Sequence, residues 1–250
     1  MSEWEVVFVF CVLFLGGFVK GSIGFGTPLV AAPLLALLLV PQNVATLLAF
    51  SLLLSNIADA YRLRSEWRAI REISLYLPFA LAFVPVGVWF LGFGDPDFIR
   101  LMMGVMAYTY LLVESRLGSF KELGSGLQKI VAAGMGALLG FVYGTTTISG
   151  VISTIYFSML RLPKNPFIFL MNIFNAAGMS IMVLSLSHQG IYTKPRFIEG
   201  LLAIIPIGIG YLVGIRVRER IDQALFFRII RVALFFIATS LVIKFILAKM

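Results

Sequence analysis

Apolar runs long enough to cross a bilayer recur along the whole of this 250-residue chain, and the polar stretches between them are short. A helix needs about 20 consecutive, mainly apolar residues to cross the hydrocarbon core. Hydrophobic residues make up 60% of the chain and charged residues 13%, which leaves too little polar surface for a soluble domain of this size. The sequence therefore predicts an all-α polytopic membrane protein.

The apolar runs divide into ten segments, two of which, 22–40 and 146–160, are short for a full crossing. We expect each short segment to form a Gly- or Pro-interrupted hairpin with the segment before it, which either spans the membrane or re-enters it. The ten segments are 4–19, 22–40, 42–61, 73–94, 97–114, 128–144, 146–160, 165–187, 197–215 and 223–247.

Three short motifs recur in the same order in the two halves of the chain, which predicts an internal repeat. The matches are "GFVKG" (17–21) with "GFVYG" (140–144), "VPQN" (40–43) with "LPKN" (162–165), and "VPVG" (84–87) with "IPIG" (205–208). We therefore predict two repeats of about five hydrophobic segments each, at residues 1–120 and 121–250. An odd number of segments per repeat gives the two halves opposite orientations, so the repeats are predicted to be inverted.

The loop charges agree with this inversion. Loop 62–71 carries four arginines, which places it in the cytoplasm, whereas its counterpart 187–196 carries only one lysine and one arginine. The resulting topology has an outside N-terminus, and it leaves Lys244 and Lys249 outside, against the positive-inside rule. The loops predicted to be cytoplasmic are 62–71, 115–127, 161–164 and 216–222.

The composition also limits the partners and cofactors. A net charge of +8 comes without a basic stripe that contains interleaved aromatic residues, so we expect the lipid bilayer and a small anionic substrate as partners and no nucleic acid. One cysteine and one histidine exclude a disulfide within the chain and argue against a zinc site. We expect neither a metal nor a cofactor, and the sequence leaves the oligomeric state open.

Glycine and polar residues interrupt the first hairpin of each half, at 16–26 and 140–150. If each hairpin dips into the membrane, the two breaks meet near mid-depth, and each restarting helix directs free N–H groups and the positive end of its dipole into the cavity. Hydroxyl groups and an ammonium beside such helix ends favour an anion. The candidate substrate-binding residues at the breaks are Lys20, Gly21, Ser22, Gly24, Phe25, Gly26, Tyr143, Thr145, Thr146, Thr147 and Ser149.

Several of these candidates have a second interpretation. Lys20 either lines the break or extends to a membrane surface, and the glycines also suit tight helix packing. Asn172 and Asn175 share a helix face and either line the substrate path, as further candidates, or form hydrogen bonds between helices. For Asp59 the alternatives are a local ion pair with Arg62 and a proton relay, and we expect the ion pair because Asp59 lies near the end of its segment beside Arg62.

The stretch "GFVKGSIGFGTPLVAAPLLALLLVPQNVA" (17–45) resembles the glycine-rich opening motif of the TauE/SafE family, the sulfite exporter-like membrane proteins. The residues that carry the resemblance are Gly21, Gly24, Phe25, Gly26, Pro28, Pro33 and Pro41. The resemblance implies a secondary transporter that exports sulfite, thiosulfate or organosulfonates such as sulfoacetate by alternating access, in the plasma membrane of a prokaryote. The second copy departs from the motif, with "TTTISGV" in place of "SIGFGTP".

Two other functions compete with a transporter. An anion channel could use the same site without alternating access. An intramembrane serine protease would use Ser149 and needs a base within hydrogen-bond reach, but the single histidine, His188, falls in a predicted loop. We therefore expect a protein that is not an enzyme.

Overall fold

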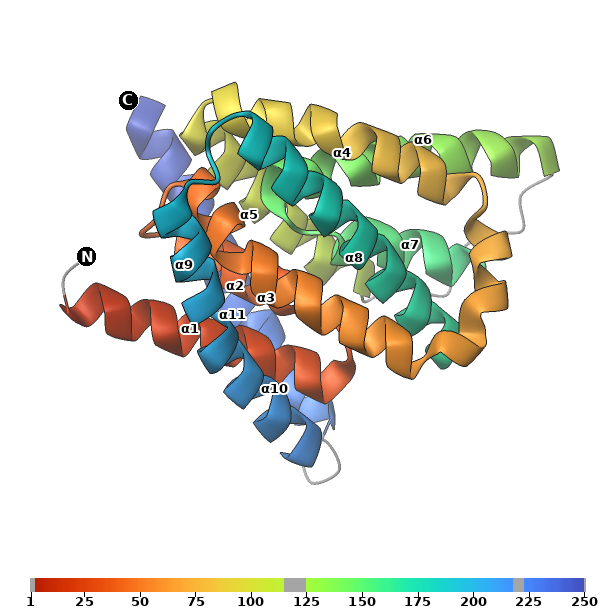
Figure 1. Cartoon of the computed structure of the whole chain (residues 1–250), viewed down its shortest axis with the longest axis horizontal. Coiled ribbons are helices and arrows are strands. Elements are labelled where there is room, and N and C mark those ends of the chain that lie inside the picture. Colours follow the sequence, from red (N-terminus) through yellow and green to blue (C-terminus); the bar gives the residue numbers. More distant parts are fainter. Residues whose placement is uncertain (1–2, 115–124, 218–222, 250) are drawn as a thin grey trace.

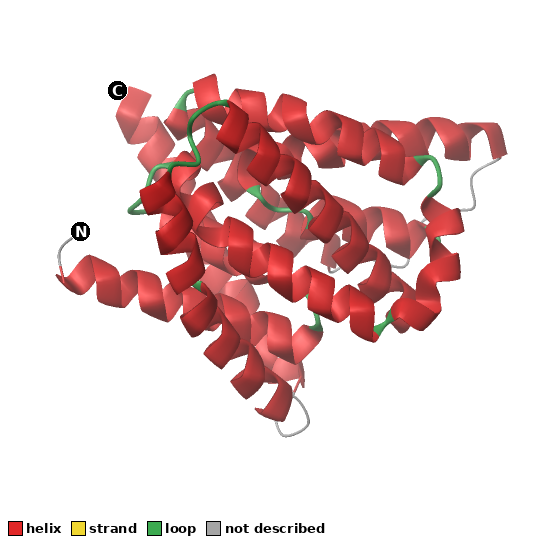
Figure 2. Cartoon of the chain, viewed as in Figure 1, coloured by secondary structure: helices red, strands yellow, loops and turns green. Residues whose placement is uncertain are grey.

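The computed structural model describes residues 3–114, 125–217 and 223–249, and every regular element in these ranges is a helix (Figure 2). The elements in chain order are α1 (Glu3–Ile23), α2 (Thr27–Ala36), α3 (Pro41–Arg62), the 3₁₀ helix η1 (Arg64–Ile73), α4 (Tyr76–Phe93), α5 (Pro96–Glu114), α6 (Ser125–Thr146), α7 (Gly150–Met159), α8 (Lys164–His188), α9 (Lys194–Leu202), α10 (Ile204–Val217) and α11 (Gln223–Lys249).

Six stretches of the described chain are long and apolar enough to cross a membrane: α1, α3, α4, α6, α8 and the consecutive pair α9–α10. This confirms a polytopic membrane protein. The predicted segment 197–215 is two helices, α9 and α10, and not one. The helices α2 and α7 have only 10 residues each, so they extend about 15 Å, half of a hydrocarbon core of about 30 Å.

The order of long and short helices repeats along the chain, because α7 begins as far after α2 as α8 begins after α3. The pairing of helices is exchanged between the halves: α1 packs along α10, and α4 packs along α6. Figure 1 shows that α1 and α6 run in opposite directions, as do α3 and α8. Their orientation relative to a bilayer remains a prediction.

Parts of the predicted topology lie outside the described residues. These are the boundary between the repeats at 120 and 121, most of loop 115–127 and most of loop 216–222. Lys244, which runs against the positive-inside rule, donates a 2.9 Å hydrogen bond to the carbonyl of Leu37 just beyond α2. Its ammonium therefore satisfies a free carbonyl at the end of that helix.

Glycines permit the two closest helix pairings. Gly17 and Gly21 of α1 lie against backbone carbonyls of α10, and Gly140 and Gly144 of α6 lie against backbone carbonyls of α4, so that a Cβ at any of them would collide with a carbonyl oxygen. The matched motifs "GFVKG" and "GFVYG" therefore make equivalent contacts in the two halves.

The match of "VPVG" with "IPIG" is wrong in register. Gly87 of the first motif packs closely against the backbone of α6, whereas Gly208 of the second has no atom within 4 Å of where its Cβ would stand. The glycine that packs against α1 as Gly87 packs against α6 is Gly214. A short apolar motif recurs by chance in so apolar a chain. Only the helix contacts identify which glycine of α10 is the counterpart of Gly87.

The two helix breaks are narrower than predicted. The helix α1 continues to Ile23 and α6 continues to Thr146, because the glycines within them are held by packing against α10 and α4. The breaks are Gly24–Gly26 and Thr147–Ser149. Left-handed backbone ends each helix, with φ of 93° at Gly24 and 64° at Thr147.

Candidate functional site

Lys20 lies near the end of α1 with its side chain only 2% exposed. Its ammonium donates hydrogen bonds to Ser55 Oγ at 2.9 Å and to Asn56 Oδ1 at 2.5 Å, and it lies 3.4 Å from Asp59 Oδ2. All three partners come from α3. A buried ammonium is costly unless it is paired and hydrogen-bonded, and this one is both. The lysine therefore points into the bundle, which excludes the interpretation that it extends to a membrane surface.

Asp59 connects Lys20 to the surface of the protein. The Tyr211 hydroxyl, from α10, donates to Asp59 Oδ1 at 2.5 Å. Arg62, one turn further along α3 and 65% exposed, lies 3.7 Å from Asp59 Oδ1 and donates to the Tyr211 hydroxyl at 3.1 Å. The predicted ion pair of Asp59 with Arg62 is confirmed, but the same carboxylate also pairs with Lys20.

Sequence reasoning missed two members of this cluster, Ser55 and Tyr211. Ser55 and Asp59 are four residues apart, the spacing that puts two side chains on one helix face, so that pattern could have been found. Tyr211 gave no such signal, because the contact joins residues 152 positions apart. We name the five residues Lys20, Ser55, Asn56, Asp59 and Tyr211 the lysine cluster.

Tyr143 stands in the second half where Lys20 stands in the first, as the motifs "GFVYG" and "GFVKG" show. Its hydroxyl donates to the backbone carbonyl of Asn175 at 3.1 Å. Its ring lies against Gly178, the α8 counterpart of Ser55, because a Cβ at that glycine would come within 2.9 Å of the ring. The second half therefore has an aromatic contact where the first half has an ion pair.

The predicted hydroxyl groups are buried at the breaks and already donate to the backbone. Ser22, Thr145 and Thr146 each donate to the carbonyl four residues earlier, at 2.7 to 2.8 Å, and Thr147 donates to the Thr146 carbonyl at 2.6 Å. In this conformation they offer a ligand lone pairs and not protons, so an anion would require them to rotate. Ser149 is 1% exposed and directly precedes α7.

The first break lies against the beginning of α8. Gly24 faces the side chain of Ile168, and the Phe25 ring is 5.9 Å from the Phe167 ring. Gly26, with φ of 100°, is the residue from which α2 starts. Gly21 packs against the backbone of α10, as described above, and its contact is one of helix packing.

The helix α8 passes both breaks. Ile168 at the first break and Asn175 at the second are seven positions apart, which is roughly 10 Å along a helix. Asn172, between them, donates to the Ile168 carbonyl at 2.8 Å. The amide oxygen of Asn175 is buried and has no hydrogen-bond partner among the described residues. The structure thus brings the predicted residues of both halves to one helix and leaves one polar atom unpaired there.

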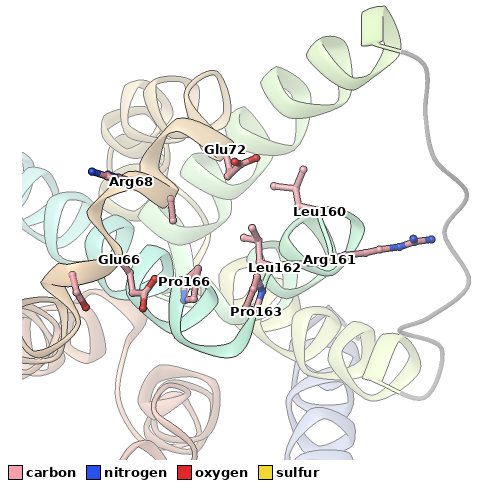
Figure 3. Close-up of a pocket in the computed structure, with 10 residues that line it drawn as sticks. Glu66, Arg68, Glu72, Leu160, Arg161, Leu162, Pro163 and Pro166 are labelled. Carbon is pink, nitrogen blue, oxygen red and sulfur yellow. The ribbon is translucent and has the colours of Figure 1, made fainter.

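A pocket of about 480 Å³ lies at the other end of α7, between η1 and the turn that joins α7 to α8 (Figure 3). Its lining contains none of the predicted site residues. In Figure 3 the Arg161 side chain extends away from Glu66 and Glu72. The lining residues are Ser65, Glu66, Arg68, Ala69, Glu72, Leu160, Arg161, Leu162, Pro163 and Pro166.

The membrane-spanning helices, with two half-length helices that begin inside the bundle, define the chain as a multi-pass α-helical membrane protein. A family model described as "Sulfite exporter TauE/SafE" matches residues 9–241, and the chain belongs to that family. Membership makes it a membrane transporter of the sulfur-anion exporter type. No curated protein and no solved structure matches the chain.

Proposed function

We propose that this protein is a secondary transporter that exports small sulfur-containing anions, such as sulfite, thiosulfate or organosulfonates of the sulfoacetate kind, across the plasma membrane of a prokaryote. The observation that carries this proposal is the pair of half-length helices, α2 and α7, whose N-termini lie inside the bundle at breaks with left-handed backbone. Family membership supports the class of substrate.

The N-terminus of α7 is the better of the two places for the anionic group. The first N–H groups of a helix have no partner within it and carry the positive end of the dipole. In α2 the second residue is Pro28, which has no N–H, whereas α7 begins with Gly150, Val151 and Ile152, all of which have one. The Asn175 side-chain amide, turned so that its Nδ2 group faces the break, and the hydroxyls of Thr147 and Ser149, after rotation, would donate the remaining hydrogen bonds to the sulfur oxygens.

Lys20 would supply the positive charge from the other half. Strong-acid anions keep their charge in the membrane, so a site for them needs a cation or several oriented dipoles nearby. Among the described residues, Lys20 is the only lysine or arginine that is buried, with 2% of its surface exposed.

Alternating access would follow from the exchanged pairing of helices. Inverted repeats change access by rocking one bundle against the other around a fixed site. The close pairs α1–α10 and α4–α6 each join the two predicted repeats, 1–120 and 121–250, so we propose that each pair moves as a unit. We also propose that the N-terminus lies outside, as the loop charges predict.

The test combines binding and flux. The melting temperature of the purified protein would be measured with sulfite, thiosulfate, sulfoacetate, taurine and acetate, since a ligand of the folded state raises it. Counterflow of labelled substrate into proteoliposomes would then be measured on the parent, on Lys20→Met and on Lys129→Met, which removes an exposed lysine from α6.

We expect a shift selective for sulfur oxyanions and saturable counterflow in the parent and in Lys129→Met, with both lost in Lys20→Met. Flux without counterflow would identify a channel. The absence of both a shift and flux for every sulfur anion would overturn the proposal.

A further inference from the structure

Lys20 is not a free cation. Its ammonium lies 3.4 Å from the Asp59 carboxylate, and these side chains are 2% and 9% exposed. The described lysine cluster therefore contains one positive and one negative charge in a buried place. The charge that the proposed function assigns to Lys20 is already neutralised by the protein itself.

A substrate anion that approached this pair would place two negative charges beside the one buried cation, Lys20, because the second cation on Asp59, Arg62, is 65% exposed and screened by water. Like charges at a shared buried site are strongly unfavourable, and the usual consequence is that one of them takes up a proton. If Asp59 becomes a neutral acid when the anion arrives, the cluster keeps the same net charge with and without substrate.

Asp59 can exchange a proton with the surface. Arg62 is 65% exposed and bonds the Tyr211 hydroxyl, which in turn donates to Asp59 Oδ1. A phenolic hydroxyl both donates and accepts, so Tyr211 can pass its proton to Oδ1 and take another from water, while Arg62 keeps its own proton throughout. The other carboxylate oxygen, Oδ2, faces the Lys20 ammonium at 3.4 Å and has no hydrogen-bond partner in the described structure, so a proton on Oδ1 removes the charge that holds Lys20.

Few other groups could substitute for Asp59. The charged and titratable side chains recorded in contact with it are Lys20 from α1, Arg62 from α3 itself and Tyr211 from α10. The helix α8, which packs along α3, has no ionisable side chain between Lys164 and His188, and α2 has none at all.

We infer that transport is coupled to protons through Asp59. In the empty protein its carboxylate is paired with Lys20. When the carboxylate takes up a proton, the substrate anion replaces it as the partner of Lys20. This rests on the proposed function. In the loaded state a proton is bound to the Asp59 carboxyl group and the anion is paired with Lys20, and both leave on the same side. One proton therefore moves with each anion, in the same direction.

The second half supports this stoichiometry of one proton. At the positions that correspond to Lys20, Asn56 and Asp59, it has Tyr143, Met179 and Met182. Both methionines are fully buried. These three residues cannot repeat the exchange.

The experiment uses the purified full chain in proteoliposomes, with methanesulfonate and thiosulfate as probes because both keep their charge over the pH range used. An inward gradient of each probe is applied, and lumen pH is followed with a trapped dye beside counterflow of labelled probe. We expect the lumen of the parent to acidify by one proton per anion. Asp59→Asn should retain counterflow with no change in lumen pH, and Asp59→Glu should retain both.

The matched control is Asp97→Asn, which removes an aspartate paired with Arg100 on α5 and should behave as the parent does. Counterflow in the parent without acidification would overturn the coupling and leave the proposed function intact. Failure of every sulfur anion to exchange would overturn the proposed function and the coupling with it.

A binding measurement on the parent keeps the inference testable if Asp59→Asn does not fold. With one proton taken up per anion, the apparent Kd for methanesulfonate should rise with pH, by up to about tenfold per pH unit. A Kd that is constant between about pH 5 and pH 9 would overturn the inference.

Discussion

Lys20 Nζ and Asp59 Oδ2 lie 3.4 Å apart across the interface of α1 and α3, and each side chain is more than nine-tenths buried. Breaking such a pair leaves one charge without its partner in a place that water does not reach. We therefore expect the pair to affect stability as well as the proposed transport, and the two effects can be measured separately.

The first prediction concerns the stability of this pair. Asp59→Leu should lower the free energy of unfolding by about 3 kcal/mol, because it leaves the Lys20 ammonium buried with only neutral partners. The double variant Lys20→Met/Asp59→Leu should recover most of that loss, because both charges are gone. Denaturant unfolding of the four proteins in a double-mutant cycle measures the coupling. A loss in the double variant equal to the sum of the losses in Lys20→Met and Asp59→Leu would show that the pair is not coupled.

The second prediction concerns the close packing of α4 on α6. Gly140→Ala should destabilise the protein by about 1–3 kcal/mol, because its Cβ would collide with the Ala80 carbonyl. The control is Gly134→Ala in the same helix, which has nothing within 4 Å of its Cβ and should be neutral or stabilising by up to about 1 kcal/mol. Melting temperatures in detergent compare the two, and a similar effect of both would contradict the packing argument.

The third prediction concerns backbone strain at the second break. Thr147 has φ of 64°, where a β-branched residue is strained by about 1–3 kcal/mol. Thr147→Gly should raise the melting temperature, whereas Thr146→Gly, at the helical end of α6, should lower it. If Thr147 also contacts the anion, the same variant should weaken methanesulfonate binding as it gains stability. A loss of stability in Thr147→Gly would show that the strain is absent.

The fourth prediction concerns pH dependence outside the membrane spans. Burial raises the pKa of Tyr192, in the loop between α8 and α9, from about 10 to about 12. A raised pKa stabilises the folded state below the unfolded value, so this contribution is complete below about pH 10 and is lost as pH rises towards 12.

Tyr192→Phe should therefore be less sensitive than the parent to alkaline unfolding between those values. At neutral pH it should be no less stable, because the Tyr192 hydroxyl is buried and has no hydrogen-bond partner among the described residues. The melting temperatures of both proteins would be measured at about pH 8 and pH 11. An equal fall in melting temperature between these pH values in Tyr192→Phe and in the parent would contradict the prediction.

Local features of the chain predicted most of the fold. Apolar runs gave the spanning helices, and the glycines of 17–21 and 140–144 marked equivalent helix faces, because both signals depend only on nearby residues. The predicted width of the helix breaks was wrong. Packing of Gly17 and Gly21 against α10 decides whether residues 16–23 stay helical. No local pattern carries that information.

The candidate site was predicted in its parts but not in its connections. Lys20 and Asp59 were both singled out from the sequence, yet each was given a separate role, because they are 39 positions apart and nothing local pairs them. Tyr211, whose hydroxyl completes the cluster, comes from α10 and gave no signal. Contacts between distant elements depend on the tertiary arrangement, which a single sequence does not specify residue by residue.

The replacement of the Lys20 position by Tyr143 in the second half has an energetic consequence for the cycle. Two identical inverted repeats that exchange conformations would give inward-open and outward-open states of equal energy. Among the described residues, only the first half holds an ion pair between its first helix and its third, so an exchange of conformations between the halves does not give an equivalent molecule. If access alternates as proposed, the empty protein should therefore rest predominantly open to one side.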